Sequence, residues 1–237
     1  MRPGTKSPLV MLGHLGMTGR MYLANTRAPL PRHCPVVLEL GKQRFVFEDT
    51  RYFGRLTLDL SPLEALGPEP LSDAFHPQYL ATNLKRSRQP IKVKLLDQSL
   101  VAGVGNIYAS EALFRARISP RLSAHRLTFA QTERLHCSIR EVLLEAIQGG
   151  STVALNFSGN GKTDGLFYFG SAPGTSGSYE ERLLVYDRAG KPCFRCHASI
   201  RRLQQAGRSS YFCPVCQGKL SRGSKLLNQS RKRKQTN

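Results

Sequence analysis

Four cysteines near the C-terminus constrain this chain more than any other feature of its sequence. They form two C-x₂-C pairs separated by the sixteen residues HASIRRLQQAGRSSYF: Cys193, Cys196, Cys213 and Cys216. Each pair can hold two thiolates on one tight turn, and two such turns build a closed tetrahedral metal site. The intervening segment is long enough for a β-hairpin. Disulfides or unrelated thiols are the alternatives, but this spacing, without a secretory signal, favours one structural Zn²⁺.

The charge of the chain indicates a polyanionic partner. Its 35 Lys and Arg residues outnumber 16 Asp and Glu residues, which gives a formal net charge of +19. From Lys191 to Asn237 there are twelve basic residues and no acidic one. Such a field suits nucleic acid, because phosphate neutralisation and counterion release then dominate the affinity. An anionic membrane is the competing partner, but no apolar run approaches a membrane span and no basic amphipathic helix is evident.

The length of the chain limits the number of hydrophobic cores, and its N-terminal composition indicates the cellular location. A chain of 237 residues can bury one large core or two modest ones. The first residues, MRPGTKSPLVMLGHLG, hold one short apolar patch and no proper signal-peptide core. We therefore expect a cytoplasmic protein, associated with the nucleoid through its basic charge.

The N-terminal part of the chain is expected to form β-structure. VVLEL at 36–40 and RFVFED at 44–49 flank a Gly-Lys-Gln turn, and RLTLDL follows at 55–60. The connector LGPEPLS at 66–72 is rich in Pro and Gly and is the predicted domain boundary. The first domain is therefore placed at residues 1–66.

Residues 73–150 change to a helical pattern. The clearest helix begins at Thr128, where Gln131 completes a capping-box pattern, and it ends before Gly149 and Gly150. Its apolar residues recur at helical spacing and are predicted to face the core: Leu135, Ile139, Val142, Leu143, Ala146 and Ile147.

The run GVGNIYASEALF at 103–114 suggests a phosphate contact. Gly103 and Gly105 permit a tight turn, and Asn106 stands where a helix would begin. Helix N-terminal amides and an Asn side chain together can hold a phosphate. A plain packing corner between two helices is the alternative interpretation of this pattern.

Three segments complete the organisation of the C-terminal part. Residues 151–182 are rich in Gly and Ser with embedded aromatic residues, and a loop of this length is usually either functional or disordered. The cysteine pairs define a zinc ribbon at 183–220. The last segment, 221–237, is a solvated basic tail that could add DNA affinity.

Several runs, taken together, resemble the bacterial formamidopyrimidine-DNA glycosylase family, of which endonuclease VIII is a cousin. They are HLGMTG at 14–19, DTRYFG at 49–54, LGPEPLS at 66–72, GVGNIYASE at 103–111 and the cysteine pairs at 192–216. The similarity runs in order from about Leu9 to Gln217 and favours the formamidopyrimidine branch. It implies an α+β fold: a partial N-terminal β-sandwich, a helix–two-turn–helix domain at 73–150 and a C-terminal zinc-ribbon hairpin.

The resemblance also implies base-excision repair of damaged double-stranded DNA by a monomeric enzyme. Members of the family excise oxidised purines, notably 8-oxoguanine and formamidopyrimidines, and cleave the abasic strand by β,δ-elimination through a Schiff base. The damaged base must leave the stack, and another group must fill the gap. The loop at 151–182 would correspond to the segment that closes over the flipped base.

Individual roles carry over to residues that match the family motifs. Met17, Arg51 and Phe53 would form the wedge, since an apolar side chain can unstack a step and Arg can bond the orphaned base. Core packing is the alternative for Met17 and Phe53. Arg208 would hold the phosphates beside the lesion, with a catalytic part in δ-elimination. The other matched positions contact DNA or the surroundings of the lesion: His14, His33, Lys92 and Asn106.

The N-terminus departs from the family pattern. Family members begin Met-Pro-Glu, and after removal of Met the secondary amine of the proline attacks the sugar C1′. Here the chain begins Met1-Arg2-Pro3-Gly4, so neither the nucleophile nor the neighbouring glutamate is matched, and Lys6 is left unassigned. HLGM follows almost at once, so we expect the first half of the sandwich to be missing.

Three hypotheses account for this departure. The start could lie further upstream, in which case the protein is an ordinary glycosylase and lyase. Alternatively, the chain is a catalytically incomplete zinc-ribbon DNA-binding remnant, or a general nucleic-acid binder unrelated to repair. The first is favoured because half a sandwich would leave sheet edges and apolar faces uncovered. For the chain as given, we expect borohydride to trap no covalent adduct.

Overall fold

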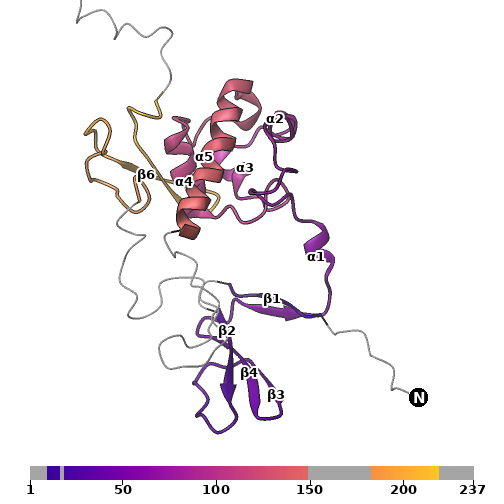
Figure 1. Ribbon diagram of the computed structural model, residues 1–237. Coiled ribbons are helices and arrows are strands. Elements are labelled where there is room, and N and C mark those ends of the chain that lie inside the picture. The colour runs from indigo at the N-terminus through magenta and orange to yellow at the C-terminus, as the bar shows by residue number, and fades with distance from the viewer. Residues whose placement is uncertain (1–9, 17–18, 149–182, 219–237) are drawn as a thin grey trace, which may run out of the picture. The chain divides into compact units, whose positions relative to one another are not determined.

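The computed structural model describes residues 10–16, 19–148 and 183–218, which form two units (Figure 1). The units divide between Leu66 and Gly67 and again between Val142 and Leu143, and the chain from Leu183 onward belongs to the second unit. Met17, the loop at 151–182 and the basic tail lie outside the described residues. Helices and sheets occur together, so the α+β class is confirmed.

The first unit consists of two small antiparallel sheets. Strand β1 (Leu12–His14) pairs with β5 (Arg55–Thr57). The second sheet has the order β2-β4-β3, with β4 (Gln43–Asp49) between β2 (Gly19–Asn25) and β3 (Val36–Leu40). The strands predicted at 36–40 and 44–49 are therefore present.

Turn chemistry explains the β3–β4 hairpin. The register places Leu40 opposite Gln43, which leaves Gly41 and Lys42 as a two-residue turn. Gly41 has a φ of +76°, a conformation that costs glycine little. The central strand is buried at Val46 and Phe47, whereas β3 leaves Leu38 and Leu40 exposed.

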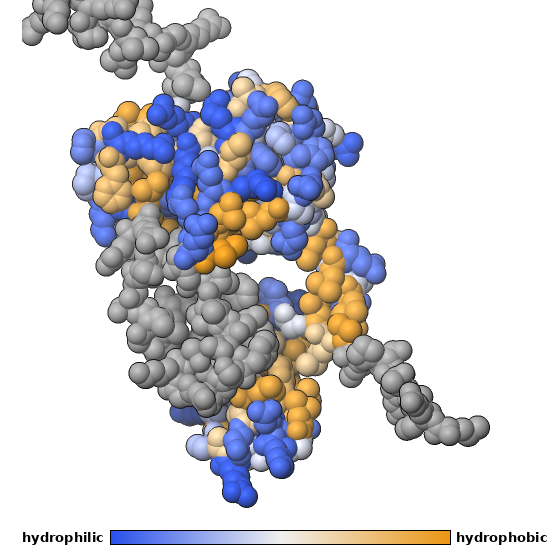
Figure 2. Space-filling model, viewed as in Figure 1, coloured by the Kyte–Doolittle hydropathy of each residue, from blue (hydrophilic) through white to orange (hydrophobic). Residues whose placement is uncertain are grey.

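The third predicted strand is shorter than expected. RLTLDL forms a strand only to Thr57, because the chain then turns: Asp59 accepts a hydrogen bond from the Ser61 amide at 3.0 Å, and the short helix α1 (Ser61–Glu64) follows. Figure 2 shows a hydrophobic strip over α1. Leu58, Leu63 and Leu66 are exposed along this segment.

Helices form the larger part of the second unit. They are α2 (Pro77–Lys85), α3 (Ile91–Leu95), α4 (Asn106–Arg115), the 3₁₀ helix η1 (Ala124–Arg126) and α5 (Phe129–Gln148). Each contributes fully or nearly fully buried side chains to a common core: Leu80, Leu84, Ile91, Leu95, Leu113, Phe114, Ala124, Leu135 and Ile139. Burial of these apolar surfaces is the main force that holds the helices together.

Helix α5 follows the sequence expectation at its start and departs from it at its end. The Thr128 amide donates to Gln131 Oε1 at 2.9 Å, and the Gln131 amide donates to Thr128 Oγ1 at 3.2 Å, so the capping box is present. The predicted core residues Leu135, Ile139, Val142 and Ala146 are buried, and Leu143 is half-buried. The prediction was wrong for Ile147, which is 55% exposed, because it lies outside the face of α5 that Leu135, Ile139, Val142 and Ala146 bury.

The C-terminal part of the second unit is a hairpin of β6 (Arg201–Gln205) and β7 (Arg208–Phe212). Ala206 and Gly207 connect them with φ values of +46° and +73°, and positive φ at both central residues is typical of a type I′ turn. Strand β7 packs against α4, so the hairpin predicted between the cysteine pairs is present and rests on the helices (Figure 1).

Candidate DNA interface and zinc site

The four cysteines converge to a single site. Their Sγ atoms all lie within 4.8 Å of one another, with Cys193 and Cys216 at 3.9 Å and Cys196 and Cys213 at 3.4 Å. A tetrahedral Zn²⁺ with Zn–S bonds of about 2.3 Å places its sulfurs about 3.8 Å apart. A disulfide requires about 2.05 Å, and all four thiols are free. The residues therefore fit one structural zinc, with no place for a catalytic fifth ligand.

Backbone geometry shapes each metal-binding turn. The Arg195 amide points to Cys193 Sγ at 3.4 Å, and the Cys216 amide points to Cys213 Sγ at 3.3 Å. Such N–H···S contacts stabilise a thiolate, which is the form that binds metal. Each C-x₂-C sequence thus folds locally into half of the site.

Gln217 joins this zinc ribbon to the helices. It is 1% exposed, its Oε1 accepts from the Cys213 amide at 2.9 Å, and its Nε2 donates to the Ile118 carbonyl at 2.9 Å. Cys193 and Cys213 are themselves buried in one cluster with Phe114. The ribbon and the helical core therefore form one packed structure, so loss of the metal affects both.

Three of the predicted DNA-contact residues meet in the second unit. Lys92 lies on α3, Asn106 begins α4, and Arg208 begins β7 just past the hairpin turn. The Lys92 Nζ donates to Asn106 Oδ1 and to the Ser209 carbonyl, the latter at 3.0 Å. Lys92 thereby links both helices to the strand that presents Arg208, and we name these three residues the phosphate cluster.

The electrostatics of the phosphate cluster suit an anion. Lys92 is fully buried, although a lysine is seldom buried without an acidic partner. Burial, and secondarily the positive charge of Arg208, together lower the pKa of Lys92 to about 8. An anion bound here would offset both effects, because it favours the charged ammonium.

The turn that leads into α4 has open space beside its two glycines. Gly103 has a φ of +74°, and a side chain on Gly103 or Gly105 would meet nothing within 4 Å. Gly105 is the N-cap residue and has no side chain to bond the first-turn amides. The dipole of α4 therefore adds positive potential beside Asn106.

Two residues of this region were not assigned a role from the sequence. Glu111 is 2% exposed, and its carboxylate accepts from the backbone amides of Leu184, Val185 and Tyr186 at 2.8–2.9 Å. It therefore holds the segment that leads into the zinc ribbon against α4. Glu111 stood within the motif GVGNIYASE, but only its partners, more than 70 residues away, reveal its role.

Tyr186 is the second such residue. Its hydroxyl accepts a hydrogen bond from Asn106 Nδ2 at 3.4 Å, and its ring packs edge-on against Tyr211 with centroids 5.0 Å apart. A tyrosine hydroxyl that accepts one hydrogen bond can still donate its own proton to a phosphate oxygen. No local signal in the sequence marks it.

In the first unit, two turns carry the remaining predicted residues. His14 ends β1, and its Nδ1 accepts from the Gly16 amide at 3.1 Å. Arg51 and Phe53 lie on the turn between β4 and β5, with the Arg51 guanidinium 4.8 Å from the centre of the Phe53 ring. Phe53 is 54% exposed, so it does not pack in the core of this unit.

His33 lies close to the same turn. Its ring meets Tyr52 edge-on, with centroids 6.1 Å apart, and its carbonyl accepts from the Asp49 amide at 2.9 Å. The structure therefore gathers His14, His33, Arg51 and Phe53 in one region, which we name the wedge region. Their contacts with DNA stay predictions.

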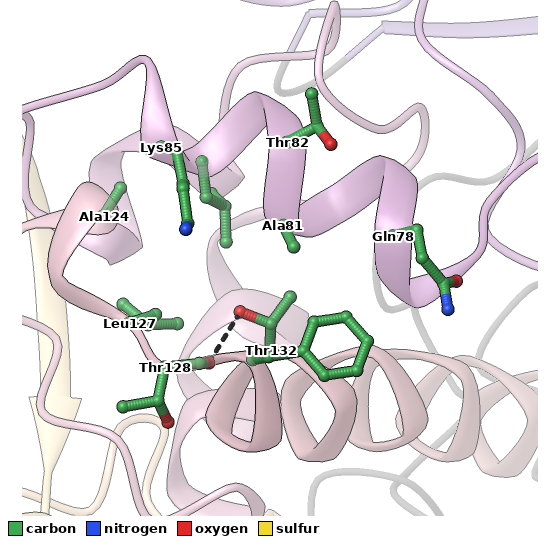
Figure 3. A pocket seen from close by; sticks show the side chains of 10 residues that line it. Gln78, Ala81, Thr82, Lys85, Ala124, Leu127, Thr128 and Thr132 are labelled. Atoms are coloured by element: carbon green, nitrogen blue, oxygen red, sulfur yellow. Dashed lines mark hydrogen bonds between the residues drawn. The ribbon is translucent and has the colours of Figure 1, made fainter.

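A hollow on the second unit lies apart from these residues. It is lined by α2, η1 and the start of α5 and has a volume of about 320 Å³. Figure 3 shows Lys85 and Gln78 on its α2 side, with Thr128 and Thr132 joined by a hydrogen bond on the α5 side. None of the predicted DNA or zinc residues lines it.

Three family models match the chain in consecutive parts. The formamidopyrimidine-DNA glycosylase N-terminal domain matches residues 4–56. The H2TH domain of formamidopyrimidine-DNA glycosylase matches residues 66–156, and a zinc finger found in FPG and IleRS matches residues 190–218. The helix–two-turn–helix and zinc-ribbon expectations are thereby confirmed.

The curated relatives that match the chain are formamidopyrimidine-DNA glycosylases. The formamidopyrimidine-DNA glycosylase of Chloroflexus aurantiacus is 44% identical over 210 residues, which cover 86% of this chain and 71% of the relative. That of Symbiobacterium thermophilum is 44% identical over 222 residues, covering 89% of this chain and 68% of the relative.

Solved structures agree with the sequence relatives. The chain is similar to Lactococcus lactis Fpg in a complex with abasic-site DNA, with a TM-score of 0.72, 34% identity, and coverage of 88% of this chain and 75% of that one. It is also similar to Lactococcus lactis FPG in a complex with FAPY-dG DNA, with a TM-score of 0.72, 33% identity, and coverage of 88% of this chain and 75% of that one. By sequence over its length and by fold, the chain belongs to the formamidopyrimidine-DNA glycosylase family.

Proposed function

We propose that the protein acts in base-excision repair, removing oxidised purines such as 8-oxoguanine and formamidopyrimidines from double-stranded DNA and cleaving the abasic strand by β,δ-elimination. Membership of the family supports the reaction. The observation that carries the proposal is the phosphate cluster, which joins α3, α4 and the zinc hairpin through the buried Lys92. Among the described residues no carboxylate bonds Lys92, and a lysine buried in this way is suited to an anion that arrives from outside.

In this proposal the second unit holds the backbone beside the lesion. A phosphate accepts hydrogen bonds from Arg208, Asn106 and the amides that begin α4. Zinc keeps the hairpin rigid, so the guanidinium of Arg208 is presented at little entropic cost. Arg208 also stabilises the phosphate that leaves during δ-elimination, which is its proposed catalytic part.

The wedge region of the first unit acts on the same duplex. Phe53 is exposed and apolar, which suits insertion at a destabilised step, and Arg51 offers planar donors to the orphaned base. His14 and His33 flank the turn and contact the strand around the lesion. Met17 belongs to this set by sequence and lies outside the described residues.

Zinc supplies structure to this site and no chemistry. Within residues 10–16, 19–148 and 183–218 we assign no Schiff-base nucleophile, so Arg208 is the one catalytic residue proposed. No helix among the described residues is long and apolar enough to cross a membrane. We propose that the protein works as a monomer in the cytoplasm, associated with the nucleoid that holds its substrate.

An excision assay tests the proposal. The protein is tagged at its C-terminus and purified from its native cells, so that any residues encoded upstream of Met1 are included. It is then incubated with duplexes that carry 8-oxoguanine or guanine at one position. We expect release of free 8-oxoguanine, cleavage of that strand with phosphates on both sides of the gap, and a borohydride-trapped adduct. Tight lesion binding without release would indicate instead the catalytically incomplete remnant. Equal binding of both duplexes would contradict a role in repair.

A further inference from the structure

The turn that carries Arg51 and Phe53 is held from inside by one buried carboxylate. Asp49, the last residue of β4, is 0% exposed. Its Oδ1 accepts from the Arg51 amide at 3.2 Å, and its Oδ2 accepts from the Gly54 amide at 2.7 Å. The two oxygens thus bond the backbone on both sides of Tyr52 and Phe53.

The rest of the turn is shaped around this carboxylate. Tyr52 has a φ of +54°, which disfavours a bulky residue and persists only where the surroundings enforce it. A Cβ on Gly54 would lie 2.2 Å from the Phe47 ring, so the chain passes directly over the sheet there. A Cβ on Gly16 would lie 2.9 Å from the Phe53 backbone, which shows that the turn after His14 packs against the same loop.

The chemistry of the contact requires a carboxylate. Two backbone N–H donors need two acceptor oxygens within the span of one short side chain. Asparagine offers one oxygen and would turn an NH₂ group toward the other donor. Glutamate is longer by one methylene, and a buried site tolerates added volume poorly. Aspartate is therefore the side chain that satisfies both amides.

We propose that Asp49 is a positioning residue, whose carboxylate sets the conformation of the turn that presents Arg51 and Phe53 to a damaged base pair. The inference rests on the proposed function, because it assigns these two side chains to the wedge. Asp49 touches no DNA. It acts by lowering the entropy that the turn must lose when the wedge enters the duplex.

The ratio of the affinities for a lesion-containing duplex and an undamaged duplex, here called lesion preference, tests this role directly. The 237-residue chain and its Asp49→Asn variant are titrated with a duplex that carries a tetrahydrofuran abasic analogue opposite 2-aminopurine, and with the undamaged duplex. We expect the variant to lose about tenfold in preference for the lesion, as befits one buried hydrogen bond with a charged partner. The lesion-induced change in 2-aminopurine fluorescence should shrink, and affinity for undamaged DNA should stay within about twofold.

Two further variants separate positioning from general destabilisation. Asp59→Asn is the matched control, because Asp59 also accepts a hydrogen bond from a backbone amide in this unit, that of Ser61, but it is exposed and lies after the turn, beyond β5. It should leave lesion preference unchanged. In a background that carries both Arg51→Ala and Phe53→Ala, Asp49→Asn should have no further effect, since residues that act through one another are not additive. An additive loss there, or full preference in the single variant, would overturn the inference.

Amide hydrogen exchange keeps the test decisive if Asp49→Asn does not fold. In the wild-type chain the Arg51 and Gly54 amides should exchange slowly although the side chains around them are exposed. Fast exchange at both positions would reject the inference. Failure of the proposed function looks different: the wild-type chain would then show no lesion preference, whatever the state of these amides.

Discussion

The two units present their candidate DNA contacts by different physical means. In the second unit, Lys92 and Glu111 are buried ionisable groups that bond elements far apart in the chain, and a metal holds the hairpin. In the first unit, the wedge region lies on exposed turns that one carboxylate and close glycine contacts hold locally. The comparison teaches that the proposed phosphate contacts are supported from the core, whereas the proposed wedge, which would enter the duplex, lies at the surface.

Removal of zinc should have the largest effect, and it should disrupt the second unit while leaving the first unit folded. Cys213→Ser deletes one of four thiolates, so the ribbon should release its metal and unfold, because binding free energy in such sites is folding free energy. Metal content and DNA affinity should fall together. Cys137→Ser, which alters an exposed thiol outside the site, is the control. Stoichiometric zinc in Cys213→Ser would contradict the assignment.

Loss of the Glu111 carboxylate should have the next largest effect. Glu111→Ala removes the acceptor of three backbone amides, of which that of Val185 is fully buried, so the free energy of unfolding should fall by about 3 kcal/mol. Urea unfolding measures the change. Glu133→Ala on the exposed face of α5 is the matched control and should change stability by less than about 0.5 kcal/mol. An equal loss in both variants would mean that the buried carboxylate has no special role.

Arg208→Ala should weaken DNA binding without unfolding the ribbon. Arg208 is exposed and lies next to the residue that Lys92 bonds, so its removal should cost about tenfold in affinity and lower the salt dependence by about one released ion. Zinc content should stay at one per chain. Arg201→Ala, an exposed arginine on the partner strand β6, should have a smaller effect. If Arg201→Ala weakened DNA binding more than Arg208→Ala, the phosphate contact would lie on β6 and not at Arg208 beside the hairpin turn.

The titration of Lys92 should give the smallest effect. Its pKa is about 8 in the folded chain against an ordinary value of 10.5, so between these values the folded state binds fewer protons than the unfolded state. Stability from this group is therefore lowest below pH 8 and rises toward pH 10.5. DNA affinity should change in the opposite direction, because the neutral amine attracts phosphate less.

Lys92→Met isolates this contribution from other groups that titrate above pH 8. The difference in unfolding free energy between wild type and variant should change across the window from pH 8 to 10, and the pH dependence of DNA affinity should flatten in the variant. If the unfolding free energies of both proteins changed with pH in parallel, the pKa of Lys92 would be the same in the folded and unfolded states, and this prediction would be wrong. The first unit has no buried lysine among its described residues, so this test sharpens the contrast between the two units.

Patterns that act over a few residues were predictable. The C-x₂-C pairs, the Thr128 capping box and the glycine turn after Leu40 each specify a local backbone shape, and the structure shows all three. The strand at 55–60 and the burial of Ile147 were predicted less well. In the first case, the local turn between Asp59 and Ser61 competes with the strand, and in the second, the face of α5 that meets the core is set by its neighbours.

By itself the sequence determined the zinc ligands, the order of the elements and the family, because thiolate spacing, turn chemistry and motif order are properties of neighbouring residues. Only the tertiary structure decided that Lys92 reaches the carbonyl of Ser209, 117 residues away, that Glu111 binds the segment before the ribbon, and that Asp49 caps the wedge turn from inside. These contacts depend on which elements pack together. A buried charge selects its partners by proximity in space, since it must be satisfied wherever packing excludes water.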